Sequence, residues 1–227
     1  MFVDNAAYLA VRDRIISVVS AADAARIVPT CPEWRVKDVV GHLVGLCEDW
    51  VDHRLDGYAS EEWTAAQVDR FAASTLDEVV ERWYRSSERF VRLDDDPVMG
   101  PPARWAFGDA INHEADIRGA LGAARVPHDA VVVGLKGSVS RWREVLSQAK
   151  TPALLLRAPD ARDWWLGVHD DPEMTVVKAP AYEFFRALTG RRSQAQMSKW
   201  EWSSDPQPYL AAGLPYPFHP ASTDIQD

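Results

Sequence analysis

The sequence is poor in cysteine and has no long apolar run. Its two cysteines, Cys31 and Cys47, do not form a CxxC pair, and nothing implies a disulfide framework. No stretch approaches the roughly 18 uninterrupted apolar residues of a transmembrane helix. The N-terminal residues lack a basic start followed by an apolar block, so they do not resemble a secretory signal. These absences predict a cytoplasmic protein that does not bind membranes.

Basic residues are outnumbered, and they form no run. The 25 Lys and Arg against 34 Asp and Glu give a formal charge of −9. Nucleic acid binding depends on Lys and Arg at phosphates, so a nucleic acid partner is not expected. The sequence also has no Gly-rich phosphate loop and no G-x-S-x-G elbow, which disfavours a serine hydrolase of that type. The expected partners are therefore small molecules, and the protein is expected to be a monomer or a homodimer.

What is present is an ordinary globular composition over 227 residues, with 47% hydrophobic and 26% charged residues. The first 150 residues show apolar positions at spacings of three and four, which predicts amphipathic helices. Thr75 and Glu78 form a capping-box pattern at the start of one of them. The expected helices span about residues 5–22, 32–55, 75–91, 105–123 and 129–147. Trp50, Trp83 and Trp142 lie on their apolar faces and are expected in the core.

The pattern changes near Thr151. Three short segments, ALLLRA, DWWLGVHD and MTVVKAP, are rich in β-branched and aromatic residues and are predicted strands. One helix is expected over Tyr182–Leu188, ending at Gly190, and the tail from Ser203 is expected to be irregular. The fold class is therefore mainly α. A helical bundle is predicted over residues 1–150 and a small α+β domain over 151–227.

Two histidines within the helical segments could bind a metal. Asp109 and His113 are four residues apart and Asp116 follows three later, so all three project from one helix face. If His42 faces them across the bundle, two imidazoles and one carboxylate would form a site with an open coordination position. Such a set suits zinc and also non-heme iron.

Simpler interpretations exist for each of these residues. Asp109 could be a surface residue near the start of a helix. His42 could be a histidine at the edge of the core, and Asp116 could orient a histidine ring without binding metal itself. Glu114 and Arg118 are spaced as an ion pair on a solvated helix face. Cys31 is expected to be a small buried side chain rather than a reactive thiol.

Three short motifs resemble those of the mycothiol-dependent maleylpyruvate isomerase family, part of the DinB-like superfamily of metal-binding four-helix bundles. They occur in the order expected for that family and span most of the chain. The matched residues are Pro32, Trp34, Asp38, His42 and Leu43, then Asp109, His113, Asp116 and Arg118, then Leu188 to Arg191.

The resemblance implies that His42, Asp109 and His113 bind a divalent metal, Zn²⁺ in first place with Fe²⁺ or Ni²⁺ as alternatives. Some members of the family carry Glu where this chain has Asp109. Because Asp is one methylene shorter, the helix must lie closer to the metal or the carboxylate must bind it differently.

The metal would lower the pKa of a low-molecular-weight thiol such as mycothiol. The thiol would then serve isomerisation or S-transfer on a small anionic or electrophilic substrate. Arg191 is the predicted catalytic residue, since its fork can bind a substrate carboxylate; the alternative is a cationic helix end. Trp105, one helical turn before Asp109, and Arg118 are the predicted cofactor-binding residues.

Two other functional classes stay open. The same residues could form a thiol-independent metal enzyme, such as a hydrolase, a lyase or a non-heme iron enzyme. The chain could also be a non-catalytic binding protein that keeps the bundle without the chemistry.

Overall fold

The computed structural model describes residues 5–93, 102–167 and 174–227, with side chains of the middle range described from residue 106 onward. The chain divides into two compact units, which are described separately. The first comprises residues 1–126 together with Asp227, and the second comprises Pro127–Gln226. No helix among the described residues is long and apolar enough to cross a membrane.

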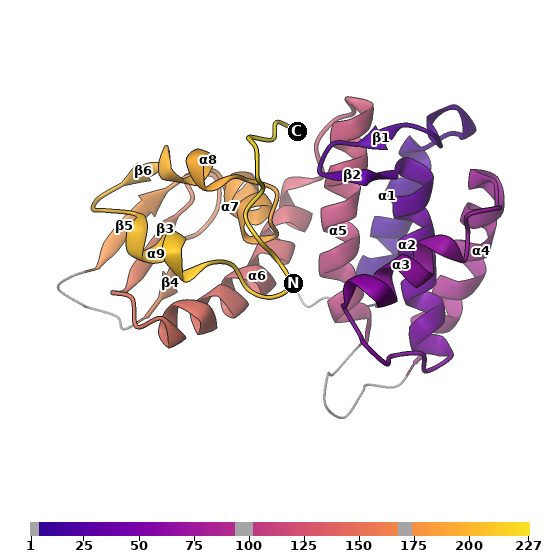
Figure 1. Ribbon diagram of the computed structural model, residues 1–227, viewed down its shortest axis with the longest axis horizontal. Helices are drawn as coiled ribbons and strands as arrows, with labels where there is room; N and C mark the ends of the chain where they lie inside the picture. Colours follow the sequence, from indigo (N-terminus) through magenta and orange to yellow (C-terminus); the bar gives the residue numbers. More distant parts are fainter. Residues whose placement is uncertain (1–4, 94–101, 168–173) are drawn as a thin grey trace. The chain divides into compact units, whose positions relative to one another are not determined.

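The first unit is a bundle of four long helices, with a short helix and a small hairpin added (Figure 1). The long helices are α1 (Asn5–Val18), α2 (Val36–Val51), α4 (Leu76–Phe90) and α5 (Pro102–Leu121). A 3₁₀ turn follows α1 at Ala21–Asp23, and α3 (Glu61–Asp69) packs on α2. Helix α2 also packs against α4 and α5, and α1 packs against α5. Helix α2 is therefore the centre of the unit.

The core of this bundle joins three helices through buried side chains. Trp83 of α4 is fully buried, and its Nε1 donates a hydrogen bond to the Tyr8 hydroxyl of α1 at 3.2 Å. The same hydroxyl lies 2.9 Å from Sγ of Cys47 on α2. Trp50 is also buried. The predicted core positions of Trp50 and Trp83 are thus confirmed.

The start of α4 follows the sequence signal, whereas the start of α2 does not. Thr75 and Glu78 form the predicted capping box, with Thr75 N donating to the Glu78 carboxylate at 2.8 Å. The helix expected from Pro32 begins only at Val36, because the residues before it form β2 (Cys31–Arg35), which pairs antiparallel with β1 (Ile27–Val28). Asp38 marks the real start, since its carboxylate accepts from Arg35 N at 2.8 Å.

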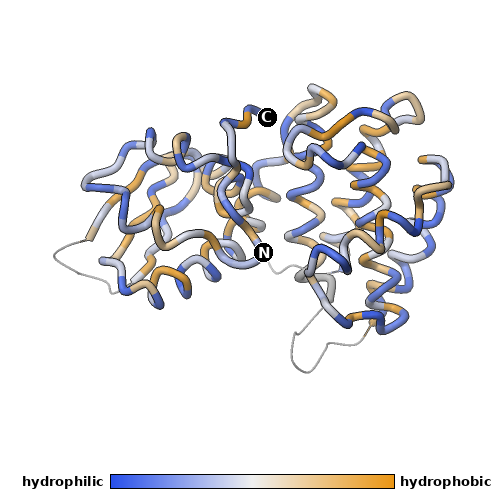
Figure 2. Tube along the Cα trace, viewed as in Figure 1, coloured by the Kyte–Doolittle hydropathy of each residue, from blue (hydrophilic) through white to orange (hydrophobic). Residues whose placement is uncertain are grey.

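The second unit combines a four-stranded sheet with helices. The strands are β3 (Leu154–Arg157), β4 (Trp164–Leu166), β5 (Thr175–Lys178) and β6 (Glu201–Trp202), in the order β4-β3-β5-β6. Strands β3 and β5 are parallel and the other neighbours are antiparallel. Leu154, Leu155 and Leu156 of β3 and Val177 of β5 are buried. Figure 2 shows apolar segments in the strands as well as in the helices. The first three strands lie inside the predicted strand segments, although residues 168–170 of DWWLGVHD fall outside the described ranges.

Helices α6 (His128–Gln148) and α7 (Ala181–Leu188) pack against each other in this unit. Their approach is close at Gly134, where a Cβ atom would lie 2.9 Å from the Phe185 ring. Trp142 on α6 is buried, as predicted. Because α6 belongs with α7, the units divide after residue 126 and not after residue 150. An amphipathic pattern shows that a helix has a partner without saying which one.

The C-terminal part holds two short helices, α8 (Gln194–Ser198) and α9 (Gln207–Ala212). The expectation of an irregular tail from Ser203 is therefore wrong at α9. Pro208 lies in the first turn of α9, where proline is well tolerated because its missing N–H has no helical partner to lose. The predicted helix end at Gly190 is confirmed, since this residue has φ +82°.

Candidate metal centre

The three residues expected to bind metal converge in the first unit. Nε2 of His42 lies 3.0 Å from Oδ2 of Asp109, and Nε2 of His113 lies 3.6 Å from Oδ1 of the same carboxylate. One ligand atom from each residue lies within 4.8 Å of the others. Both histidines are buried, whereas the Asp109 side chain is 33% exposed. The group is therefore reachable from solvent on the carboxylate side.

Helix geometry explains why these residues meet. Asp109 and His113 are one turn apart on α5, so their side chains share a face. His42 is on α2, which packs against α5, and the two imidazole rings are 5.1 Å apart between centroids. The bundle thus brings together donors that are 67 residues apart in the chain.

Trp34 of β2 lies against both imidazoles. Its ring centroid is 5.3 Å from that of His42 and 5.9 Å from that of His113. In the sequence, Trp34 is one of the residues that match the family motif. The structure adds that the indole forms an aromatic wall beside the donor atoms.

Each histidine has a polar group behind its other ring nitrogen. Nδ1 of His42 lies 2.7 Å from Oε1 of Gln67, a buried residue of α3. Nδ1 of His113 lies 3.0 Å from Oδ2 of Asp116, a contact at ion-pair distance that lacks the alignment of a hydrogen bond. Asp116 therefore has the orienting position that the sequence allowed for it.

These residues fit a divalent metal ion. Two imidazole nitrogens and one carboxylate are a common ligand set for zinc and other divalent metals, and three protein ligands leave a coordination position open. In the structure both Nε2 atoms face the same carboxylate, and both Nδ1 atoms face oxygen atoms of other side chains. The lone pairs that a metal requires can therefore be presented at Nε2 of each ring.

A second group of donors shares His113 with the first. Sγ of Cys31 is directed to Oδ2 of Asp116 at 3.9 Å, and the two residues lie close enough to His113 to form another possible ligand set. Cys31 is only half-buried, so the expectation of a small buried side chain is wrong. Cys31 begins β2, a strand whose residues are all half-buried or exposed.

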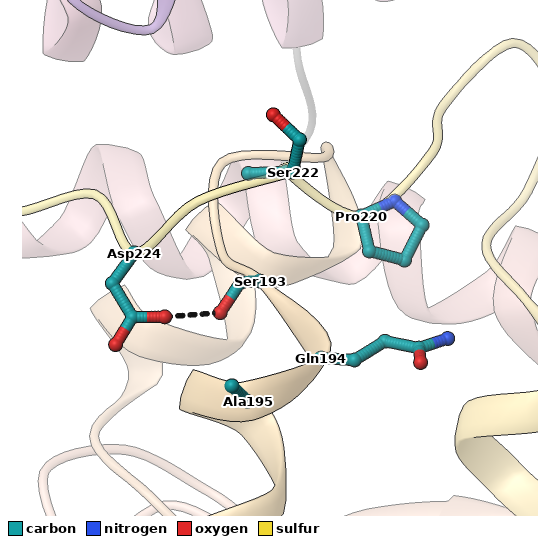
Figure 3. A pocket seen from close by; sticks show the side chains of 7 residues that line it. Ser193, Gln194, Ala195, Pro220, Ser222 and Asp224 are labelled. Carbon is teal, nitrogen blue, oxygen red and sulfur yellow. Dashed lines mark hydrogen bonds between the residues drawn. The ribbon is translucent and has the colours of Figure 1, made fainter.

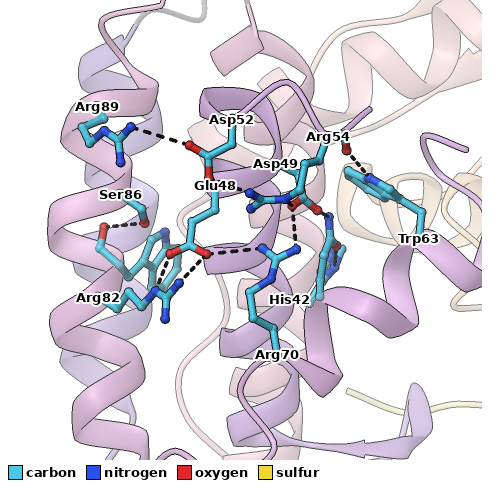
Figure 4. Close-up of polar contacts among 12 residues, drawn as sticks. His42, Glu48, Asp49, Asp52, Arg54, Trp63, Arg70, Arg82, Ser86 and Arg89 are labelled. Carbon is cyan, nitrogen blue, oxygen red and sulfur yellow. Dashed lines mark hydrogen bonds and ion pairs between the residues drawn. The ribbon is translucent and has the colours of Figure 1, made fainter. Parts of the chain in front are cut away.

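The polar network behind His42 was not predicted. Asp49 on α2 is 2% exposed, and its carboxylate accepts hydrogen bonds from Gln67 Nε2, Arg54 Nε and Arg70 Nη2. Figure 4 shows these arginines and Glu48, which is paired with Arg70 and Arg82. The only sequence signal was a pair of acidic residues continuing a helix whose face is otherwise broadly apolar.

Arg118 is engaged in a buried ion pair. Its Nε donates to Oε1 of Glu114 at 2.9 Å, and its Nη1 donates to the Ala124 carbonyl. Glu114 is fully buried and also accepts from Arg14 of α1, so the predicted solvated pair is instead part of the bundle interior. The side chain of Trp105 lies outside the part of α5 whose side chains are described.

Arg191 lies in the second unit, directly after Gly190. Its Nη1 donates to the Thr189 carbonyl, and its guanidinium lies 5.9 Å from the centroid of the Phe218 ring. The neighbouring Arg192 is buried and forms a two-pronged ion pair with Glu183 at 2.7 and 3.0 Å. Of the two arginines, Arg191 therefore stays the predicted catalytic residue.

The second unit also has a surface pocket beside α8 (Figure 3). The residues that line it are Ser193, Gln194, Ala195, Pro220, Ala221, Ser222 and Asp224. Ser193 donates a hydrogen bond to Asp224 and also caps α8. This hydrogen bond is explained by local structure, and the lining residues include no pair of the kind that activates a nucleophile.

Residues 7–132, more than half of the chain, match the family model described as the mycothiol maleylpyruvate isomerase N-terminal domain. The chain belongs to this family.

Two solved structures share the fold. The crystal structure of the mycothiol-dependent maleylpyruvate isomerase is similar with a TM-score of 0.57 and 15% identity, over 88% of this chain and 91% of that chain. A mutant of the isomerase with alanine in place of a histidine gives a TM-score of 0.55 at the same identity and coverage. The likeness supports a mainly α fold with a C-terminal sheet. No curated protein matches the chain.

Proposed function

We propose that the protein is a divalent-metal enzyme that uses a low-molecular-weight thiol of the mycothiol kind, in the cytoplasm, to isomerise or S-conjugate a small electrophilic substrate. The observation that carries the proposal is the convergence of His42, Asp109 and His113 within 4.8 Å, in a chain that belongs to the mycothiol maleylpyruvate isomerase family. Zn²⁺ is the proposed ion, with Fe²⁺ or Ni²⁺ as alternatives.

His42, Asp109 and His113 would hold the ion. A bound divalent ion with an open position would bind the thiol sulfur and lower its pKa, so that the thiolate forms near neutral pH. The Trp34 ring covers one side of both imidazoles, while the partly exposed carboxylate of Asp109 marks the side open to solvent.

The proposed isomerisation conserves all atoms. The thiol proton is released to water, and the sulfur forms a C–S bond to one carbon of the cis double bond while the π electrons move onto the activating carbonyl. The remaining single bond rotates, the electrons return, and the C–S bond breaks to give the trans double bond. The thiolate leaves with its electron pair and regains a proton. In S-transfer by addition the C–S bond is kept, and the carbon next to the carbonyl takes a proton from water when the electrons return.

Arg191 is proposed to bind a carboxylate of the substrate through its planar fork, and Trp105 and Arg118 to contact the thiol. These three roles rest on the sequence and on the family resemblance. Replacing Arg191 with Met is expected to raise the KM of an anionic substrate more than it changes thiol binding.

The test begins with metal analysis of the purified protein loaded with Zn²⁺. Wild type is expected to hold one ion per chain and His113→Ala to lose it. The matched control is His128→Ala, which removes an exposed histidine of the second unit. Failure of His113→Ala to lower the metal content would contradict the site.

The loaded protein is then given maleylpyruvate with and without mycothiol, and the trans isomer is followed by NMR. Turnover that requires the thiol supports the proposal. Turnover of any substrate without thiol would favour a metal-dependent hydrolase or lyase. Absence of metal from a well-folded wild type would favour a binding protein.

A further inference from the structure

The ring of His42 contacts a residue of α3, a helix that carries none of the three proposed metal ligands. Oε1 of Gln67 on α3 lies 2.7 Å from His42 Nδ1, and the Gln67 side chain is completely buried. A buried amide that meets an imidazole at this distance must present either an acceptor or a donor to it. Which of the two it presents decides which ring nitrogen carries the proton.

Asp49 fixes the orientation of the Gln67 amide. Its Oδ2 lies 2.7 Å from Gln67 Nε2, and a carboxylate can only accept a hydrogen bond from that NH₂ group. The Gln67 carbonyl oxygen must then face His42. Since a carbonyl oxygen only accepts, His42 Nδ1 must carry a proton. A metal ion can then be bound only at Nε2, the nitrogen that faces Asp109.

Two arginines hold Asp49 in this orientation. Arg54 Nε and Arg70 Nη2 donate to Oδ1 at 2.8 and 2.7 Å, so both oxygens of the carboxylate are occupied and its negative charge is balanced. The chain of contacts therefore runs from two guanidinium groups through Asp49 and Gln67 to His42. Figure 4 shows Arg54 and Arg70 at the Asp49 carboxylate.

A glycine makes this arrangement possible. A Cβ atom at Gly45 on α2 would lie 2.6 Å from Cβ of Gln67, which is closer than real Cβ contacts allow. Only glycine lets α3 approach α2 at the turn that follows His42. Gly45 thus leaves room for the Gln67 side chain, although a glycine lowers the helix propensity of α2.

We propose that Gln67, oriented by Asp49, is the positioning residue that fixes His42 as the Nδ1-protonated tautomer and directs its Nε2 toward the metal. This inference rests on the proposed metal site and adds a residue to it. The two histidines then differ in their support, with a neutral amide behind His42 and a carboxylate behind His113. Residues behind metal ligands commonly change metal affinity about 10- to 100-fold when they are removed.

The first test is Gln67→Met, which keeps the length of the side chain and removes both polar groups. Its Kd for Zn²⁺, measured by competition with a chelator, is expected to rise about 10- to 100-fold, and the visible spectrum of the Co²⁺ form is expected to change. The control is Ser87→Ala, which breaks a buried hydrogen bond with Arg12 that does not lead to His42. A Kd for Gln67→Met within about twofold of wild type would overturn the proposal.

The second test is the exchange Asp49→Asn with Gln67→Glu. In this double variant the new carboxylate at position 67 accepts from His42 Nδ1, and the new amide at position 49 donates to that carboxylate. The chain of hydrogen bonds is thereby restored with amide and carboxylate reversed. The double variant is expected to bind Zn²⁺ about tenfold or more tightly than Gln67→Met. If Gln67→Met does not fold, the Kd of the double variant is compared with that of the single variant Asp49→Asn in its place. Packing alone would not produce such a recovery, so its absence would also overturn the proposal.

A readout without metal separates this inference from the proposed function. In the metal-free wild type, ¹⁵N NMR is expected to show a protected proton on His42 Nδ1, and Gln67→Met is expected to lose this protection. If wild type binds no metal but shows the proton, the proposed function fails and the role of Gln67 stands. If the proton is absent from wild type, the role of Gln67 fails.

Discussion

His42 Nε2 and Asp109 Oδ2 lie 3.0 Å apart, across the contact between α2 and α5. The shorter side chain of aspartate therefore reaches the imidazole in this chain, where some members of the family carry glutamate. The two helices are close enough at this point for the Asp109 carboxylate to contact His42 without the additional methylene, as the proposed ligand role requires.

Asp109 is expected to tolerate a change of length better than a loss of charge. Asp109→Asn keeps the shape and removes the negative charge, so its Kd for Zn²⁺ should rise at least about 100-fold. Asp109→Glu keeps the charge and displaces the oxygens, and should bind more tightly than the Asn variant but less tightly than wild type. Chelator competition measures both values, and equal affinity of the Asn variant and wild type would exclude Asp109 as a ligand.

Asp116 is expected to act on the metal through His113. Its Oδ2 is 3.0 Å from His113 Nδ1, and the residue is 1% exposed. Asp116→Asn should weaken Zn²⁺ binding about 10- to 100-fold. Asp13→Asn is the control, because Asp13 pairs with Arg12 and contacts neither histidine in the described structure. If both variants bind metal alike, Asp116 has no such role.

Arg118→Met should destabilise the protein. It removes one of two arginines from the fully buried Glu114, and an incompletely compensated buried carboxylate costs about 1–3 kcal/mol. Urea unfolding measures the loss, and an unchanged free energy of unfolding would contradict the structural role. A raised Kd for the thiol, measured where the variant is folded, would give Arg118 the predicted binding role in addition.

The sequence predicted that His42, Asp109 and His113 lie together, because the signals for these residues are local. Asp109 and His113 share a helix face by spacing alone, and the motif around His42 lies on a strongly apolar helix. Gln67 could not be predicted in this way, because α3 has little amphipathic character and the contact depends on the space left by Gly45. The β-hairpin before α2 was missed for a related reason. The apolar pattern of α2 was extended back to Pro32, although the structure places that proline in a strand.

The periodicity of apolar residues also does not predict which element a helix packs against. The apolar face of α6 does not indicate in the sequence which helix it packs on. In the structure it packs on α7, with a close approach where Gly134 meets Phe185. The boundary between the units was therefore expected about 24 residues too late.

Cys47 and Tyr8 should make the protein less stable in alkali. Burial raises the pKa of the Cys47 thiol from 9.0 to about 12, and burial also raises the pKa of the Tyr8 hydroxyl that touches it. Above about pH 9 the unfolded thiol loses its proton while the folded thiol keeps it, so the folded state binds more protons. The stabilisation is fully present below pH 9 and is lost as the pH rises toward 12.

The free energy of unfolding, measured in urea from pH 8 to pH 11, tests this directly. One additional proton on the folded state raises the unfolding equilibrium constant by up to about tenfold per pH unit. Cys47→Ser cannot ionise in this range, so its free energy of unfolding should fall less than that of wild type as the pH rises. At pH 8 the variant should be less stable than wild type. Cys31→Ser keeps the contact between Tyr8 and Cys47 and should follow the wild-type slope. Parallel curves for Cys47→Ser and wild type would show that the buried thiol does not control the alkaline loss.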